Sequence, residues 1–350
     1  MKYLIDVWYV AAWPEEVGRG LLARTIAERP VVLFRREDGT PAALEDRCPH
    51  RIVPLSRGRL VGDAVECGYH GLTFDCSGAC IANPHGDHAI PRAARVRAYP
   101  VTERHGIVWI WMGQPELADP VAVPHVPYMK DSNAYKTTHV RISADYRYDL
   151  LIDNLMDLSH AEYLHKGSFS SGVFDKVTIE VKEDGDCVRM RRILHAVPIP
   201  PFFRAIYDPG DSLVDHWQDM IWHPSQIIEF EFGVVKTGHL WDEGAVQKAN
   251  HIATPATART TNYFASLTRE TDLEDADLDE LMRQGQLGPV QNEDSPMLEA
   301  QQALVGNLDI SDYKPILLNV DAGAVRVRRV VDRLLKAEEA RRVGSRALAS

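Results

Sequence analysis

The sequence predicts an α+β protein of two domains, with an all-β domain over residues 1–118 and an α+β domain over residues 119–350. The chain has 350 residues, which suggests two domains at roughly 150 residues each. Short apolar segments separated by turn residues fill the first third, whereas the remainder mixes such segments with helical patterns. This order is typical of an all-β domain followed by a mixed one. Residues 114–127 contain four prolines and mark the expected boundary.

The first domain is expected to consist of short strands. An apolar stretch within residues 1–16 predicts a buried first strand. Residues 29–46 predict two strands joined at Asp38-Gly39, which is a strong hairpin signal. Residues 62–80 repeat this pattern of strands and turns, and residues 106–113 predict one more strand.

The second domain combines both kinds of element. Leucines at helical spacing from Leu151 to Leu158 predict a helix. Residues from Asp272 onward are acidic and predict a further helix, and residues 321–342 predict a terminal amphipathic helix. Four apolar segments predict strands at residues 176–184, 187–194, 226–235 and 260–268.

Composition excludes several classes of protein. The net charge of −11 argues against binding to nucleic acid. No apolar run approaches the roughly 20 residues that a membrane span needs, and the N-terminus carries Asp6 and two tryptophans, unlike a signal peptide. We therefore expect a cytoplasmic protein without membrane segments. Its five cysteines have no regular framework and are expected to be reduced thiols or metal ligands.

Two motifs in the first domain combine cysteine with histidine, Cys48-Pro49-His50 and Cys67-x-x-His70. Each lies at a turn between predicted strands, so the two can converge on one metal centre. A Cys2His2 zinc site usually pairs its cysteines in one motif and its histidines in another. A Rieske [2Fe–2S] centre needs two thiolates on one iron and two imidazoles on the other. Because each motif supplies one of each, the pattern favours the Rieske centre over zinc.

The stretch "IDNLMDLSHAEYLH" at residues 152–165 is rich in potential ligands. His160 and His165 lie about 140° apart on an α-helix, so they can bind one metal only if the helix is distorted between them. The sequence predicts that distortion. A polar helix face with a core histidine is the alternative. Following a one-electron cluster, an iron(II) held by two histidines and one carboxylate would accept electrons and keep positions open for O2 and substrate.

The segments "CPHR", "PLSRG" and "CGYHGLTFD" resemble the Rieske domain of ring-hydroxylating oxygenases. Nearly the whole chain, including "WYVAAWPEE", "NLMDLSHAEYLH" and "EDSPMLEAQQ", resembles the vanillate O-demethylase oxygenase group, whose relatives include dicamba O-demethylase and toluenesulfonate methyl-monooxygenase. The resemblance implies a Rieske domain followed by a catalytic domain of the helix-grip type with an antiparallel sheet. It also implies a Rieske [2Fe–2S] cluster, a mononuclear Fe(II) and O2 as co-substrate.

The resemblance also implies roles for particular residues. The cluster ligands are Cys48, His50, Cys67 and His70, and the iron ligands are His160, His165 and Asp294, with Glu293 as the competing carboxylate. Asp157 bridges an iron histidine to His70 of a neighbouring subunit, which implies a homotrimer, and Asn154 lies near the iron. Asp153 and Glu162 are expected to have no special role.

The implied reaction is hydroxylation of a methyl group, which O-demethylates an aromatic compound such as a methoxybenzoate and releases formaldehyde. A separate flavin and iron–sulfur reductase would supply electrons from NAD(P)H. Three alternatives are an aromatic-acid dihydroxylase on the same scaffold, a Rieske electron-transfer protein without oxygenase activity and a zinc-binding regulatory protein. By resemblance His251 contacts the substrate. Gly285 and Glu229 replace a tryptophan and an amide of the dicamba-type pocket, so an acid could line this one.

Overall fold

The computed structural model describes residues 3–173 and 177–348. The chain forms two compact units. The N-terminal unit comprises Ile5–Met129 with Thr254–Thr257, and the C-terminal unit comprises Met1–Leu4, Lys130–Ala253 and Ala258–Ser350. The proline-rich residues belong to the N-terminal unit, where they form the short 3-10 turns η3 (Pro115–Leu117), η4 (Pro120–Ala122) and η5 (Pro127–Met129).

The N-terminal unit contains three small antiparallel sheets. The first has the order β1 (Trp8–Ala12), β11 (Ile107–Trp111), β10 (Val101–Arg104). The second has the order β2 (Leu22–Ile26), β3 (Arg29–Arg35), β4 (Pro41–Glu45), β9 (Ala98–Tyr99). The third has the order β5 (Arg59–Val61), β6 (Ala64–Glu66), β7 (Thr73–Phe74), β8 (Cys80–Ala82). The predicted hairpin at Asp38-Gly39 joins β3 to β4, and Gly39 takes the positive φ of 83° that this turn needs.

The apolar side chains of β3, β4, β6 and β7 form the core beneath the two Cys/His motifs. Phe34, Val65 and Phe74 are fully buried there, and Cys48 and Cys67 belong to the same apolar cluster. The motifs are therefore anchored by their cysteines, while their other residues extend toward the surface.

The C-terminal unit is built on a seven-stranded antiparallel sheet. Its order is β12 (Lys136–Ala144), β18 (Thr261–Arg269), β17 (Ala245–Pro255), β16 (Ile227–Lys236), β15 (Val214–His223), β14 (Cys187–Val197), β13 (Val177–Asp184). All four predicted strands are present, although position 176 lies outside the described residues. The outer strand β12, which follows the N-terminal unit directly, pairs with the last strand β18 over nine residues.

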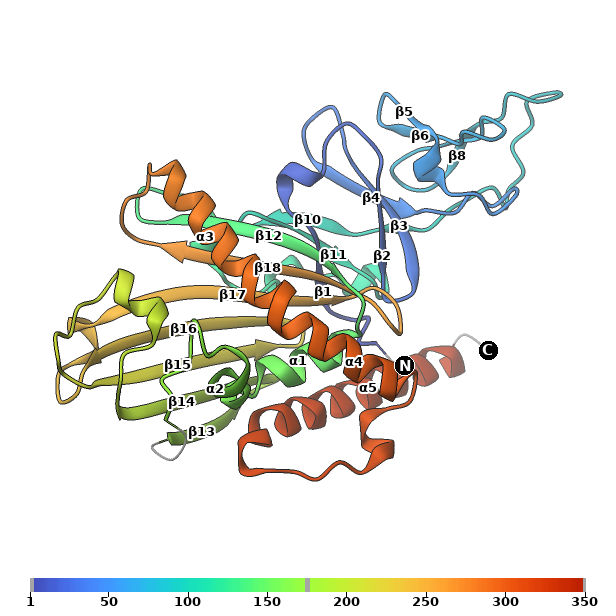
Figure 1. Cartoon of the computed structure of the whole chain (residues 1–350). Coiled ribbons are helices and arrows are strands. Elements are labelled where there is room, and N and C mark those ends of the chain that lie inside the picture. Colours follow the sequence, from blue (N-terminus) through green and yellow to red (C-terminus); the bar gives the residue numbers. More distant parts are fainter. Residues whose placement is uncertain (1–2, 174–176, 349–350) are drawn as a thin grey trace. The chain divides into compact units, whose positions relative to one another are not determined.

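Helices cover one face of this sheet. They are α1 (Tyr148–Leu155), α2 (Ala161–Leu164), α3 (Ala276–Pro289), α4 (Ser295–Val305) and α5 (Ala322–Leu348). Figure 1 shows α3 and α4 running in one line across the sheet, and a π-helical turn, η9 (Val290–Asp294), joins them. The apolar face of α1 packs with α5 against the sheet in one buried cluster that includes Leu151, Trp222 and Val327. The predicted α+β fold, with an all-β domain first, is confirmed. Among the described helices, none is long and apolar enough to cross a membrane.

Candidate active site

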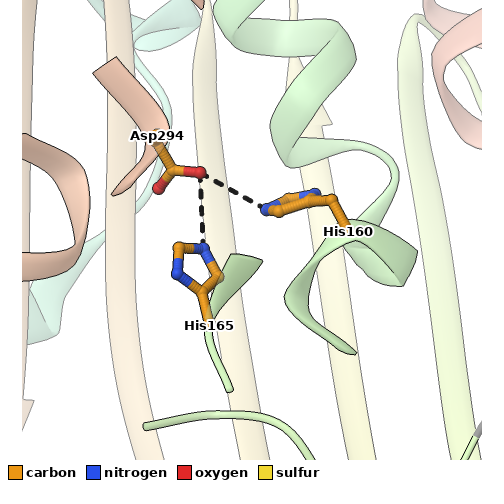
Figure 2. Close-up of side chains that lie close together, drawn as sticks. All are labelled: His160, His165 and Asp294. Carbon is orange, nitrogen blue, oxygen red and sulfur yellow. Dashed lines mark ion pairs between the residues drawn. The ribbon is translucent and has the colours of Figure 1, made fainter. Parts of the chain in front are cut away.

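The side chains of His160, His165 and Asp294 converge on one point in the C-terminal unit (Figure 2). One potential ligand atom from each lies within 4.8 Å of the others. The Asp294 carboxylate oxygen Oδ1 is 3.5 Å from His160 Nε2 and 3.3 Å from His165 Nε2. Two imidazoles and one carboxylate are the donor set that suits iron(II) with open coordination positions, so the three groups fit a mononuclear iron.

The helix carrying the histidines is interrupted before His160 and also, as predicted, between His160 and His165. Helix α1 ends at Leu155, and a 3-10 turn, η6 (Leu158–His160), leads into the short α2. The Asp157 side chain accepts a hydrogen bond from Ser159 N at 2.9 Å and caps this turn. Because α2 stops at Leu164, His165 lies beyond its end and is free of the helical geometry that would separate it from His160.

Each histidine is oriented by a bond at Nδ1. His160 Nδ1 lies 2.7 Å from the carbonyl oxygen of Asp157, and His165 Nδ1 lies 2.5 Å from Glu293 Oε2. When both Nδ1 atoms donate, both Nε2 atoms carry no proton and face Asp294. A metal-binding imidazole usually donates its other ring N–H to a carboxylate or a backbone carbonyl in this way. Burial lowers the pKa of His160 against the opposing pull of Asp294. For His165, burial also acts to lower the pKa, but Asp294 and Glu293 together raise it.

The π-helical turn η9 brings two consecutive acids to this site. Glu293 reaches Nδ1 of His165 while Asp294 reaches Nε2 of both histidines. Pro289 lacks the N–H that an α-helical bond would use, so the regular ladder fails just before the turn. Isolated π turns are frequent at functional sites. The turn therefore brings Asp294 to Nε2 of both histidines and Glu293 to Nδ1 of His165.

Sequence reasoning missed the importance of Glu162. Its side chain is 3% exposed and its Oε2 accepts hydrogen bonds from Ser170 Oγ, Ser171 N and Gly172 N at 2.6, 3.1 and 3.0 Å. Its Oε1 lies 3.6 Å from Arg192 Nη2, whose side chain is 4% exposed. Glu162 therefore holds the loop that follows His165. Nothing local distinguishes it in the sequence, because its partner Arg192 comes from β14.

Asp153, which was also expected to have no special role, is half-buried. Burial raises its pKa to about 7, while the Arg328 guanidinium, whose Nε lies 3.2 Å from the Asp153 carboxylate, acts in the opposite direction. Arg328 comes from α5, so this ion pair joins α1 to the C-terminal helix. Asp153 faces away from the three converging groups and does not line the cavity beside them.

Asn154 lies beside the converging groups. Its Nδ2 is 3.4 Å from Asp294 Oδ1. Its Oδ1 is buried, and no described residue donates a hydrogen bond to it. A buried carbonyl without a donor costs about 1–3 kcal/mol, which indicates that this oxygen has a partner when the site is complete.

A cavity of about 120 Å³ opens onto the three groups. Its wall is mainly apolar and includes Leu155, Leu158, Phe169, Phe202, Phe230 and Leu267. His251 lines the cavity, and its Nδ1 lies 2.6 Å from the Tyr263 hydroxyl. Burial lowers the pKa of His251 to about 4, so the ring is neutral. Gly285 also lines the cavity, and a Cβ there would meet no atom within 4 Å.

Glu229 is not among the residues that line the cavity. It alternates with the lining residue Phe230 along β16 and so faces the other side of the sheet, where its Oε1 lies 2.7 Å from His223 Nε2. Of the two possibilities at this position, an acid in the pocket or an acid that points outward, the structure shows the second.

The Cys48 and Cys67 motifs of the N-terminal unit share one backbone pattern. Cys48 N donates to Val53 O at 2.8 Å and Ile52 N donates to Cys48 O at 2.9 Å. Cys67 N donates to Leu72 O at 2.8 Å and Gly71 N donates to Cys67 O at 3.0 Å. In each loop the fourth residue after the cysteine has positive φ, 61° at Ile52 and 72° at Gly71. An isoleucine rarely adopts this conformation, so the rest of the loop holds Ile52 in a backbone conformation that is locally unfavourable.

These two loops bring the four predicted cluster residues together. Cys48 and Cys67 are buried, and the rings of His50 and His70 lie 4.6 Å apart at the surface. Two inner thiols and two outer imidazoles fit a Rieske cluster. His85, which the sequence indicates as a surface or hydrogen-bonded residue, is exposed, and its Nε2 lies 2.8 Å from the His70 carbonyl oxygen.

The comparisons with known proteins identify the family. Residues 144–337 match the model of the vanillate O-demethylase oxygenase C-terminal domain, and residues 7–100 match that of the Rieske [2Fe-2S] domain. The chain belongs to the vanillate O-demethylase family of Rieske oxygenases. It is an oxidoreductase, as predicted.

Relatives match over nearly their whole length. Dicamba O-demethylase oxygenase component of Stenotrophomonas maltophilia is 37% identical, covering 97% of this chain and 100% of the relative. Chloroacetanilide N-alkylformylase oxygenase component of Rhizorhabdus wittichii is 35% identical, covering 96% and 97%. Vanillate O-demethylase oxygenase subunit of a Pseudomonas species is 36% identical, covering 95% of each.

Solved structures agree with this family. Dicamba monooxygenase bound to dicamba superposes with a TM-score of 0.89 at 36% identity, covering 97% of this chain and 100% of that one. Another structure of dicamba monooxygenase contains non-heme iron and dicamba. The predicted pair of cofactors, a Rieske cluster and a mononuclear iron, is confirmed. Relatives described as oxygenase components imply a separate reductase.

Proposed function

We propose that the chain is the terminal oxygenase that removes the methyl group of an aromatic ether as formaldehyde. The observation that carries this proposal is the convergence of His160, His165 and Asp294 at the mouth of an apolar cavity, in a family whose relatives include O-demethylases. When bound, the cluster and the iron would supply electron transfer and O2 activation, so that one oxygen atom of O2 converts a methyl C–H bond to C–OH and the other leaves as water with two electrons from the reductase and two protons. A hydroxylated O-methyl group is a hemiacetal, and it separates into formaldehyde and a phenol.

In this proposal the chain's own residues hold the cofactors and shape the cavity. Cys48, His50, Cys67 and His70 hold the cluster, and His160, His165 and Asp294 hold the iron. Glu293 and the Asp157 carbonyl fix the two imidazole rings through Nδ1. The apolar wall positions the methyl group and keeps water away from the reacting atoms. His251 and Asn154 present polar atoms at the edges of the same cavity.

We further propose that electrons pass between subunits of a homotrimer. Asp157 is half-buried next to His160, and its carbonyl oxygen already holds the ring of that histidine. Its carboxylate would contact His70 of a neighbouring subunit, because a carboxylate between two imidazoles fixes both rings. Sedimentation should give a trimer. Asp157→Asn should keep both metals and the trimer but slow electron transfer at least a hundredfold in stopped-flow measurements.

The reaction is tested with purified holoenzyme, NADH, a flavin and iron–sulfur reductase and methoxylated aromatic compounds. The proposal expects one formaldehyde for each O2 consumed. A cis-diol without formaldehyde would indicate the dihydroxylase alternative, and electron transfer without O2 uptake would indicate an electron-transfer protein. Asp294→Ala should abolish O2 uptake and keep the reduced-state EPR signal of the cluster. A colourless protein without that signal would contradict the cluster assignment.

A further inference from the structure

Three side chains outside the cavity form a hydrogen-bonded chain across the sheet. Cys187 Sγ on β14 lies 3.4 Å from His223 Nδ1 on β15, and His223 Nε2 lies 2.7 Å from Glu229 Oε1 on β16. None of the three lines the cavity. Because the sulfur and the carboxylate lie at opposite nitrogens of one ring, the three groups cannot all bind one metal ion. Their order is instead that of a nucleophile, a base and a group that orients the base.

The strand register explains this arrangement. Val188 pairs with Trp222, and both belong to the apolar core under the helices. Side chains alternate between the two faces of a strand, so Cys187 and His223, which neighbour these residues in the sequence, face the other side. Glu229 lies on that same face of β16, diagonally opposite His223. The thiol, the imidazole and the carboxylate are therefore held in place by the backbone pairing of three strands.

The charge of His223 follows from its two partners. Burial acts to lower its pKa, but the hydrogen bonds to Cys187 and Glu229 raise it to about 9. The ring therefore carries both protons at neutral pH and donates from both nitrogens. The carboxylate accepts one of these hydrogen bonds and the sulfur accepts the other. A neutral thiol is only a weak acceptor, so the arrangement favours the thiolate, which is the nucleophilic form of cysteine. On the same face of β14, Arg189 is paired with Asp219 at 2.8 Å, so its charge is already compensated.

The sulfur of Cys187 is within reach of small molecules. Cys187 is half-buried and directly follows an exposed turn at residues 184–186. The side chains of His223 and Glu229 are 18% and 22% exposed. Cysteines that are buried in apolar surroundings are inert, whereas reactive cysteines are partly exposed and lie next to a positive charge. Cys187 has both properties of a reactive cysteine.

We infer that Cys187 is a reactive thiol that hydrogen peroxide oxidises to a sulfenic acid, with His223 as the proton donor. The thiolate attacks one peroxide oxygen, so that an S–O bond forms while the O–O bond breaks. The sulfur loses two electrons to the peroxide, and the leaving hydroxide takes the proton of His223 and becomes water. Hydrogen peroxide is O2 that has received two electrons and two protons, so an oxidoreductase that delivers electrons to O2 supplies it whenever no substrate takes up the oxygen. Oxidation to a sulfenic acid is reversible, which makes Cys187 a modification site separate from the iron site.

The test adds hydrogen peroxide to the oxidised holoenzyme at pH 7 without substrate. Dimedone traps sulfenic acids, and peptide mass spectrometry gives the rate at each cysteine. The reference within the chain is Cys76, which is also half-buried but has its Sγ 3.1 Å from the Asp63 carbonyl oxygen. Cys187 should react at least tenfold faster than Cys76 and than free N-acetylcysteine, of which only a few per cent is thiolate at this pH. A rate no higher than that of Cys76 would overturn the inference.

A second probe separates thiolate reactivity from oxidation by bound iron. Iodoacetamide alkylates thiolates without electron transfer, so it should show the same preference for Cys187. If peroxide labels Cys187 and iodoacetamide does not, the oxidation comes from iron chemistry and the inference is wrong.

Variants separate the action of the imidazole from a structural role. His223→Gln cannot hold the proton and should lower both rates at Cys187 at least tenfold, and Glu229→Gln should give rates in between. A loss of packing would expose the sulfur and raise the rates, so unchanged or faster labelling in His223→Gln would refute the inference. The matched control is His195→Gln, which replaces an exposed histidine of β14 and should change neither rate. Cys187→Ser should lose the label and keep O2 uptake and formaldehyde formation. Because labelling needs no turnover, missing formaldehyde would count against the proposed function alone.

Discussion

Glu162→Gln is expected to destabilise the C-terminal unit by about 3 kcal/mol. In the native side chain Oε2 accepts three hydrogen bonds from the loop at residues 170–172, while Oε1 faces Arg192. The amide of glutamine has only one oxygen. If that oxygen keeps the loop bonds, the NH2 group meets Arg192, and if it turns toward Arg192, three donors lose their acceptor.

The magnitude follows from the burial of both partners. Glu162 is 3% exposed and Arg192 is 4% exposed. Removing one member of a buried pair costs about 3–5 kcal/mol because the other charge stays buried without compensation. The lower end applies here, because Arg192 keeps its bond to Gln218. The loop also donates three backbone amides to the His165 carbonyl oxygen, so iron affinity should fall about tenfold as well.

The assay is urea unfolding of the holoenzyme followed by circular dichroism, with iron content measured on the same samples. Glu180→Gln is the matched control, because Glu180 is exposed on β13 and pairs with the exposed Lys182 at 3.5 Å; it should change stability by less than about 0.5 kcal/mol. The double variant Glu162→Gln with Arg192→Met should cost clearly less than the sum of the single changes. A loss below 1 kcal/mol for Glu162→Gln, or additive single losses, would refute the reasoning.

Three further predictions concern other positions. Asp294→Asn should lower the iron content from three to two ions per chain, whereas Glu293→Gln should retain most of the mononuclear iron. The iron content is measured by metal analysis with the cluster's EPR signal as reference, and equal losses of iron in the two variants would contradict the assignment of Asp294 as the ligand. Gly285→Ala should raise stability by about 0.5–1 kcal/mol, because alanine is the better helix former and its Cβ meets open space; a lower urea midpoint would be inconsistent with that space. Burial lowers the pKa of His223, but hydrogen bonds to Cys187 and Glu229 raise it to about 9. A histidine whose pKa is raised in the folded state stabilises the fold fully below about pH 6.5, and this stabilisation is lost as the pH rises through 9. Glu229→Gln should therefore cost about 2 kcal/mol of stability at pH 6 and little at pH 9.5. An equal cost at both pH values would disprove the coupling between His223 and Glu229.

Local signals in the sequence predicted much of the N-terminal unit. The Asp38-Gly39 turn and the short apolar segments predicted its strands, and the two Cys/His motifs are short enough for their spacing to define them. In the C-terminal unit β13, β14, β16 and β18 were also predicted, whereas β12, β15 and β17 were not. The pairing of β12 with β18 was not, because it joins segments more than 100 residues apart through the closure of the whole sheet.

The support of the active site was beyond sequence reasoning for the same physical cause. Helical periodicity assumes one regular helix, whereas the chain places His165 after a helix end and Asp294 in a π turn. Neither feature follows from residue types alone. Glu162 was expected to have no special role, since its contact with Arg192 depends on the register of β14. The family resemblance supplied Asp294, but only the geometry distinguishes its place from that of Glu293.

One buried pair serves two parts of the site. Glu162 holds the loop whose amides bind the His165 carbonyl oxygen, and Arg192 holds the amide of Gln218 in the cavity wall. The loop after His165 and one residue of the cavity wall are therefore both held by one polar contact between α2 and β14. Compared with an apolar replacement, a buried ion pair of this kind contributes little net stability. Its role is to fix the loop after His165 and the amide of Gln218 at the same time. Changes at Arg192 should consequently disturb the cavity wall and iron retention together.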